Sequence, residues 1–356
     1  MRTLVLEGTP TQIGEAHGEA MREPIRELFA HRMDNAIAQA KSYGGVDIDV
    51  EGLVAIARGC LPIVQAYAPE GYAELEGIAR GADFPLERVW AMNALTDLRD
   101  VAAFHHPEDP PDAEGCSSFI VSASRTAKGT PYVGQTWDLS TSNLPYVILV
   151  RRKPTDAPAT RTLTTVGCLS LIGMNDEGLA IGTTNLRTVD AKPGVGYLDI
   201  IHATLRATNL DDAIENIVKA PRAGAHYFYV MDRTGAAAAV ECTATDAVVQ
   251  RIAASYVHCN HILCEANAAL EAKGTPVAST HHRQRRMEAL LDRDDLTEAL
   301  LFEFLADHDG RPDSICRHDF NGITSNAGVV LSPTEGAFWA VHGPACEGTW
   351  APFDIA

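Results

Sequence analysis

The stretch Glu114-Gly115-Cys116-Ser117-Ser118-Phe119 divides the chain into two parts of different character. Residues 101–115, which lead up to Cys116, contain three prolines and four acidic residues. Such a composition is incompatible with a helix interior or a central strand. The apolar, β-branched run over 117–124 is typical of a strand. The sequence therefore predicts an exposed linker over 105–115, with Cys116 opening the first strand beyond it.

The part before the linker has helical spacing of its apolar residues. We expect helices over residues 11–40, 50–66 and 72–81, and from Pro85 to about residue 98. Pro24 should kink or split the first of these. Residues 1–104 are thus predicted to form a helical N-terminal segment.

The part after the linker is rich in short β-type runs divided by Gly, Pro and Asn. Helical patterns interrupt them over 199–219, with a restart at Asn209, and over 280–292 and 296–308. This pattern predicts a sheet-rich α+β domain over 116–356 with helices on its faces. Strands are expected over 117–124, 130–138, 146–151, 161–172, 179–185, 227–232, 237–243, 247–251, 256–258, 328–332 and 337–342.

Length and charge limit the classes of function. The chain has 356 residues, of which 46% are hydrophobic and 21% charged, which excludes a disordered or fibrous protein. A net charge of −18 argues against nucleic acid or an anionic membrane as a partner. No run approaches 18 apolar residues, and eight cysteines without regular spacing indicate reduced thiols. We expect a soluble, cytoplasmic protein.

Cys116 is the first candidate for chemistry. If the chain were cut between Gly115 and Cys116, Cys116 would carry a thiol and a free α-amine. That amine has a reference pKa of about 8, so it could serve as the base for its own thiol. The alternative is a buried strand cysteine without a chemical role.

Three polar residues at strand ends could complete such a site. Asp138 ends a strand about twenty residues after Cys116, a separation that suits an adjacent antiparallel strand. Asn185 and Asn260 each follow a β-rich run, where a side-chain amide can donate to an oxyanion. Each of the three could instead be an ordinary turn residue.

Taken in order along the chain, these and other motifs resemble those of the N-terminal-nucleophile hydrolases. The resemblance is strongest to the acyl-coenzyme A:6-aminopenicillanic acid (isopenicillin N) acyltransferase family, and more distant to the choloylglycine hydrolases. The motifs that carry it are Gly8-Thr9-Pro10, Gly14, Gly18, residues 74–79, Gly115-Cys116-Ser117-Ser118, residues 134–138, 173–185, 259–261 and 314–318, Phe338-Trp339 and Gly343-Pro344.

The resemblance implies an N-terminal-nucleophile αββα sandwich, in which two packed, mostly antiparallel sheets lie between helix layers. It implies a precursor that cuts itself at Gly115–Cys116, leaving an α fragment and a β fragment (116–356) that stay associated. By the same resemblance Cys116 is the nucleophile, Asp138 positions its amine, and Asn185 and Asn260 lie near the oxyanion.

The resemblance also bears on the substrate. Gln135 stands where the bile-salt enzymes carry an arginine, which argues against a bile-salt substrate and favours the acyltransferase branch. Gln135, Trp137 and Arg317 are candidate substrate-binding residues. Arg317 could equally be a structural ion-pair residue. The basic run 281–286 is either a solvated face or a contact for an anionic substrate such as the coenzyme A phosphates.

These observations predict a self-processing cysteine hydrolase or acyltransferase that forms an S-acyl-enzyme from an amide, peptide-like or thioester substrate. No cofactor is expected, although a coenzyme A thioester could be the acyl donor, and a homo-oligomer is compatible with the sequence. No metal site is predicted, because His258, Cys259, His261 and Cys264 lack a second cysteine pair at zinc-ligand spacing. The alternative is a catalytically silent or unprocessed binding homologue on the same fold.

Overall fold

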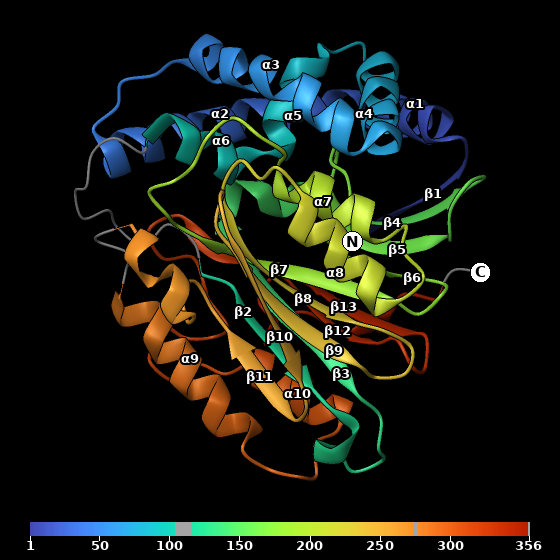
Figure 1. Ribbon diagram of the computed structural model, residues 1–356, viewed down its shortest axis with the longest axis vertical. Coiled ribbons are helices and arrows are strands. Elements are labelled where there is room, and N and C mark those ends of the chain that lie inside the picture. Colours follow the sequence, from blue (N-terminus) through green and yellow to red (C-terminus); the bar gives the residue numbers. More distant parts are fainter. Residues whose placement is uncertain (104–114, 273–276, 355–356) are drawn as a thin grey trace.

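Two sheets packed face to face between helices form a four-layer αββα structure, as predicted (Figure 1). The structure, a computed structural model, describes residues 1–103, 115–272 and 277–354. Strands of the two sheets contact each other across the centre, chiefly β3 and β2 against β7. The α+β class predicted from the sequence is therefore confirmed.

The larger sheet has eight strands and is antiparallel except at one edge. There the N-terminal strand β1 pairs in parallel with β4, so that Leu4 lies beside Val150. The sequence analysis did not predict β1, and this strand ties the N-terminal segment directly into the sheet. In spatial order the strands are β1 (Arg2–Gly8), β4 (Val147–Pro154), β5 (Thr160–Thr165), β6 (Ile172–Asn175), β7 (Ala180–Leu186), β8 (Ala225–Met231), β9 (Ala237–Cys242) and β10 (Ala247–Ile252).

The smaller sheet has six strands, all antiparallel to their neighbours, and it carries Cys116 at its start. Cys116 directly precedes β2, which pairs with β3 in a register that places Ser117 opposite Thr136. A bulge between Ser325 and Ala327 interrupts the β3–β12 ladder beside Asp138. In spatial order the strands are β11 (Ser255–His258), β2 (Ser117–Val121), β3 (Tyr132–Ser140), β12 (Ile323–Ser332), β13 (Ala337–His342) and β14 (Ala351–Pro352).

Helices cover the outer face of each sheet. The N-terminal helices, blue to teal in Figure 1, lie together with α7 and α8 on the side of the larger sheet, and α9 and α10 cover the smaller one. The helices are α1 (Pro10–Ala20), α2 (Arg22–Gly44), α3 (Val50–Tyr67), α4 (Pro69–Ala82), α5 (Leu86–Asn93), α6 (Leu95–Ala103), α7 (Tyr197–Thr204), α8 (Leu210–Lys219), α9 (Val277–Leu291) and α10 (Glu298–Leu305).

Two predicted elements are divided at other points than expected. The helix over 11–40 breaks at Met21, and Pro24 lies in the first turn of α2, where a proline costs no hydrogen bond. The strand predicted over 161–172 is two strands, β5 and β6, joined by a turn in which Gly167 has φ +70°. Periodicity alone does not locate such a turn, because the residues around it are also apolar and buried.

Glycines allow α1 and α4 to pack with almost no space between their backbones. A Cβ atom added to Gly14 would lie 2.0 Å from the Glu74 carbonyl oxygen, and one added to Gly77 would lie 2.3 Å from that of Thr11. Both distances are far below van der Waals contact, so a side chain at either position would force the helices apart. Gly14 of the opening motif is therefore needed for the close packing of α1 against α4.

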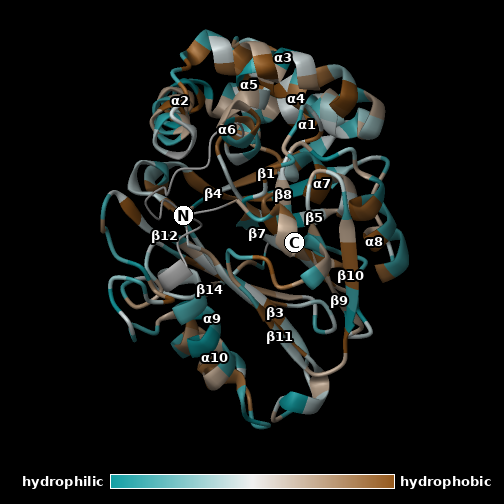
Figure 2. Cartoon of the chain, turned by 60° about the vertical axis from the view of Figure 1, so that its left-hand side comes forward, coloured by the Kyte–Doolittle hydropathy of each residue, from teal (hydrophilic) through white to brown (hydrophobic). Residues whose placement is uncertain are grey.

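By length and composition alone, α3 is apolar enough to cross a membrane, a test that core helices of water-soluble proteins also pass. Figure 2 shows brown and teal residues alternating along it. One of its faces, with Leu53, Ala57 and Val64, is buried against α5 and α6. The helix predicted over residues 50–66 is therefore present as α3, and the structure places it in the helical layer.

Candidate active site

Cys116 lies between the two sheets, at the end of a small cavity. Its side chain is buried, and its Sγ is 4.0 Å from the Asp138 carbonyl oxygen. Both sheets and the N-terminal helices contribute to the cavity, so segments far apart in the sequence meet here. The lining residues are Thr96, Cys116, Trp137, Asp138, Leu139, Leu171, Thr183, Asn185, Tyr197 and His226.

Unpaired polar atoms gather around this cavity. Four of its lining residues each have a buried side-chain atom without a hydrogen-bond partner among the described residues: Thr96 Oγ1, Asp138 Oδ2, Asn185 Oδ1 and His226 Nδ1. Buried polar groups are nearly always paired, so four unpaired atoms on one small cavity require an explanation. Each of these atoms can pair with a water molecule or with a polar group of a ligand that enters the cavity.

Asp138 is the predicted acid, and the structure places it beside Cys116. One carboxylate oxygen accepts a hydrogen bond from Ser325 Oγ at 2.7 Å, and the other has no partner within the described part of the chain. Burial raises the pKa of Asp138 to about 7, and the charges of Arg317 and Arg283 oppose this shift. A carboxylate with a pKa near 7 can exchange protons at neutral pH.

Asn185 and Asn260 are brought together, although they come from different sheets. Asn185 is on β7 and lines the cavity, while Asn260 follows β11 and donates from Nδ2 to the Asn185 carbonyl oxygen at 3.0 Å. Rotating the Asn185 amide exchanges its oxygen and nitrogen, so the same side chain can present an N–H to the cavity. Asn260 does not line the cavity and contacts Asn185 from outside it.

Arg283 is a site residue that the sequence analysis missed. Its side chain is fully buried, its Nη1 donates to the Cys116 carbonyl oxygen at 2.6 Å, and its Nη2 donates to Asn260 Oδ1 at 3.1 Å. The basic run 281–286 is therefore not simply a solvated face. Arg283, Met287 and Leu291 recur at every fourth residue of α9 and are all buried, and this spacing was the available signal.

Of the candidate substrate-binding residues Trp137 and Gln135, Trp137 lines the cavity and Gln135 does not. The Gln135 side chain is fully buried between the sheets, where Oε1 accepts from the Thr183 N–H and Nε2 donates to the Thr183 carbonyl, both at 2.9 Å. Gln135 therefore serves as a polar link between β3 and β7. This placement differs from the predicted contact with substrate, because both ends of the amide are already used.

Gln135→Met is expected to lower the free energy of unfolding by about 2–4 kcal/mol, because it leaves the Thr183 N–H and C=O unpaired in the interior. Urea unfolding measures the change, with Gln250→Met on the exposed face of β10 as the control that should change by less than about 0.5 kcal/mol. Unchanged stability together with impaired substrate binding would return Gln135 to the substrate-binding residues.

Arg317 lies against the Gly115–Cys116 junction. Its side chain is buried, and a Cβ atom added to Gly115 would lie 2.1 Å from Arg317 Nη1. Gly115 itself is buried, which differs from the exposed linker predicted over 105–115; the rest of that linker lies outside the described residues. Both residues of the junction are thus buried, and Arg317 lies against it.

A His–Asp pair next to the cavity was also missed. His226 Nε2 is 3.1 Å from Asp97 Oδ1, and the His226 ring stacks on Tyr197 with 4.6 Å between ring centroids. His226 is opposite Asn185 in the β7–β8 ladder, so both side chains reach the same cavity. Nothing in the strand pattern singled out His226, because every residue of β8 is buried.

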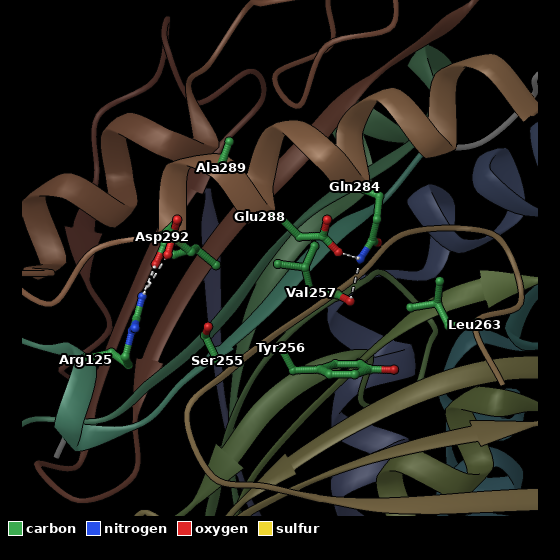
Figure 3. Close-up of a pocket in the computed structure, with 10 residues that line it drawn as sticks. Arg125, Ser255, Tyr256, Val257, Leu263, Gln284, Glu288, Ala289 and Asp292 are labelled. Atoms are coloured by element: carbon green, nitrogen blue, oxygen red, sulfur yellow. Dashed lines mark hydrogen bonds and ion pairs between the residues drawn. The ribbon is translucent and has the colours of Figure 1, made fainter.

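A larger cavity, of about 430 Å³, lies between β11 and α9 and is drawn in Figure 3. Some of its polar groups are paired: Gln284 donates to Glu288 at 2.7 Å and to the Val257 carbonyl at 2.9 Å, and Arg125 contacts Asp292. Gln284 Oε1 and Arg125 Nε are buried without a hydrogen-bond partner among the described residues. No predicted site residue lines it. Cys116 and Asp138, the predicted nucleophile and acid, line the smaller cavity, so the candidate chemistry is placed there.

Comparison with known proteins identifies the family. The family model described as acyl-coenzyme A:6-aminopenicillanic acid acyl-transferase matches residues 125–334, more than half of the chain. The chain belongs to this family. The resemblance noted in the sequence is therefore confirmed, and the matched range includes Asp138, Asn185, Asn260 and Arg283.

The individual relatives and solved structures share 13–25% sequence identity with this chain. The acyl-coenzyme A:6-aminopenicillanic-acid-acyltransferase 40 kDa form of Emericella nidulans is 25% identical over 320 residues, which cover 89% of this chain and 85% of that protein. Among solved structures, a variant of conjugated bile acid hydrolase from Clostridium perfringens aligns with a TM-score of 0.47 at 13% identity, over 68% of this chain and 97% of that one. Penicillin V acylase from Agrobacterium tumefaciens aligns with a TM-score of 0.45 at 13% identity, over 67% and 86%.

Proposed function

We propose that this family member is a self-processing acyltransferase or amidohydrolase whose nucleophile is the thiol of Cys116. The observation that carries the proposal is the cavity at Cys116, where Asp138, Asn185 and His226 each direct a polar atom that has no partner among the described residues. A nucleophile, an acid with a pKa near 7 and an amide in one enclosed space are the parts that acyl transfer needs.

In the proposed processing step, the Cys116 sulfur attacks the Gly115 carbonyl carbon. The Gly115–Cys116 C–N bond breaks, the acyl group moves to sulfur, and the proton lost from the thiol ends on the nitrogen, which becomes the α-amine of Cys116. Water then hydrolyses the thioester, releasing the Gly115 carboxylate and restoring the thiol. Arg283 holds the Cys116 carbonyl, and Arg317 covers Gly115, so both ends of the junction are fixed before the attack.

In the processed enzyme, the α-amine takes the thiol proton while sulfur attacks the substrate carbonyl. Asp138, through its Oδ2, orients that amine and holds its charge. Asn185 donates to the developing oxyanion, and Asn260 fixes Asn185 through its backbone carbonyl. The amine then protonates the leaving group, and water or an acyl acceptor resolves the S-acyl-enzyme.

The substrate class follows from the relatives and from the cavity. The Emericella nidulans relative is named for acyl-coenzyme A and 6-aminopenicillanic acid, which supports an acyl thioester or a compact amide as the acyl donor. The cavity of about 30 Å³ has room for one or two water molecules. We therefore propose that cleavage, by freeing the chain that ends at Gly115, makes the room that an acyl group needs.

An acyl-trapping experiment tests the proposal. Cleaved, tag-free protein is incubated with coenzyme A thioesters and N-acyl amides, quenched in acid and weighed intact. We expect the 116–356 fragment to gain one acyl group, bound to Cys116 and removable by neutral hydroxylamine, because thioesters react with it readily. Cys264→Ser, a cysteine outside the cavity, should be acylated like the wild type. A cleaved chain that takes no acyl group from any donor would instead favour a silent binding homologue.

A further inference from the structure

A second cluster of reactive side chains lies away from the Cys116 cavity. Two segments form it: the loop between α10 and β12, and the loop between β13 and β14. The potential ligand atoms, one from each of four side chains, all lie within 4.8 Å of one another. The four residues are His308, Cys316, His318 and Cys346.

Three of the distances between ligand atoms in this cluster are close to those of a tetrahedral metal site. The two sulfur atoms are 3.7 Å apart, the two imidazole Nε2 atoms are 3.0 Å apart, and Cys346 Sγ is 3.2 Å from His318 Nε2. Zinc bonds of about 2.3 Å to sulfur and 2.0 Å to nitrogen, at tetrahedral angles, give separations of about 3.8, 3.3 and 3.5 Å in the same order. All three observed distances lie within about 0.3 Å of these values.

The surroundings of the cluster fit a metal site as well. His318 turns Nε2 inward, and its Nδ1 lies 3.1 Å from Glu347 Oε1. A carboxylate behind the outer nitrogen of a histidine is the usual way in which a zinc ligand is oriented. On the other side, Arg286 of α9 binds both carboxylate oxygens of Asp307, at 3.0 and 2.6 Å, which fixes the start of the loop.

We propose that His308, Cys316, His318 and Cys346 bind one Zn²⁺ ion. Two thiolates and two imidazoles are a ligand set that zinc prefers, and four protein ligands leave no open position for substrate. Binding converts both thiols to thiolates and releases two protons, so the bound ion and its ligands carry no net charge. The proposed site is therefore structural, whereas the sequence analysis predicted no metal site.

Two other arrangements of these groups compete with zinc. In one, the four side chains only hydrogen-bond to one another. In the other, Cys316 and Cys346 form a disulfide, which requires an oxidant and a movement of the two sulfur atoms from 3.7 to about 2.05 Å. The hydrogen-bonded arrangement pairs the two Nε2 atoms only if one imidazole donates and the other accepts, and the disulfide leaves both imidazoles without a role; the zinc site uses all four atoms in the same way.

The zinc site would connect to the chemistry through Arg317. This residue lies between two of the ligands, and its guanidinium covers Gly115 and acts on Asp138. Ligand bonds on both sides of Arg317 would hold its backbone in place. This consequence rests on the proposed function, whereas the metal site itself does not.

Metal analysis of the purified full chain is the first test. Tag-free protein, expressed with added zinc and passed through gel filtration, is expected to hold about one zinc per chain by plasma mass spectrometry. Cys346→Ser changes the one exposed ligand and should reduce the content at least tenfold. Cys264→Ser, a cysteine outside the cluster, is the matched control and should retain the metal.

Cobalt provides a readout that does not depend on a variant. Wild-type protein stripped with a chelator and titrated with Co²⁺ should show visible bands of tetrahedral intensity and a thiolate charge-transfer band, saturating at one equivalent. Substoichiometric zinc with no cobalt spectrum would overturn the site, as would a Cys316–Cys346 disulfide in freshly purified protein. Cys346→Ser is expected to slow cleavage at Gly115–Cys116. Cleavage at the normal rate would show that the zinc site does not influence processing, and it would not affect the measurement of zinc content.

Discussion

Cys116→Ala is expected to remain a single chain of 356 residues, whereas the wild type separates on denaturation into residues 1–115 and 116–356. The substitution removes the only proposed nucleophile for both processing and acyl transfer. Acyl-transfer activity should therefore fall by at least about 10⁴-fold, as expected when a covalent nucleophile is deleted. Intact mass under denaturing conditions checks the first result, and steady-state rates check the second.

The control for this experiment is Cys264→Ala, which should cleave and turn over like the wild type because Cys264 does not line the cavity. A wild-type chain that is never cut would remove the α-amine from the mechanism. Cleavage in Cys116→Ala would show that another group, or a contaminating protease, breaks the bond. Either result would refute self-processing by Cys116.

Asp138→Asn is expected to lower acyl-transfer activity by about 10²–10⁴-fold, because the amide cannot hold the charge or the proton that the carboxylate holds. Cleavage at Gly115–Cys116 should also slow. The variant should fold, because asparagine has the same shape as aspartate and its Oδ1 can still accept the hydrogen bond from Ser325 Oγ. Activity within tenfold of the wild type in fully cleaved protein would exclude Asp138 from the mechanism.

Asp138→Asn should lower activity but raise the free energy of unfolding at high pH. This effect on stability is best measured in the Cys116→Ala background, in which the chain stays uncut. The folded-state pKa of Asp138 is raised from 3.8 to about 7, so the folded chain binds more protons than the unfolded chain between these values. Stability contributed by this group is therefore present at low pH and is lost as pH rises from about 4 to 7. From pH 5 to pH 8 the loss is roughly 2–3 kcal/mol, at about 1.4 kcal/mol per pKa unit.

Asp138→Asn should abolish the pH dependence of stability that comes from the Asp138 carboxyl group. The double variant should therefore be more stable than Cys116→Ala at pH 8 and differ little from it at pH 5. Urea midpoints of the two proteins at both pH values measure it, and the difference between the proteins cancels the titration of all other groups. A stability difference that does not change with pH would show that Asp138 has an ordinary pKa.

The sequence pattern predicted the change from a helical part to a sheet-rich part, and the resemblance to the family implied the αββα layers. The change from helical spacing to short β-branched runs at Cys116 is a local property, and so is the position of Asp138 at the end of the next strand. Strand β1 was missed because seven residues at a chain end have no repeating pattern to distinguish them. Its strand character comes from pairing with β4, nearly 150 residues away.

The remaining site residues take their roles from contacts between elements, which spacing along the chain shows only in part. Gln135 and Trp137 are two residues apart on β3, yet Trp137 lines the cavity and Gln135 binds the backbone of β7. Arg283 belongs to a run of charged residues that composition assigns to the surface. Only the packing of α9 against β2 and β11 shows that it reaches Cys116.

The β1–β4 ladder would join the two products of the proposed cleavage, because β1 belongs to the shorter product and β4 to the longer one. The shorter product would supply an edge strand to the sheet and Thr96 to the cavity wall, while the longer one would supply Cys116, Asp138 and Asn185. Reactivity and part of the selectivity would thus be carried by separate polypeptides. Such a molecule is a naturally split enzyme, in which the short half can be exchanged by co-expression to change the fit of the acyl group while the reacting half stays untouched.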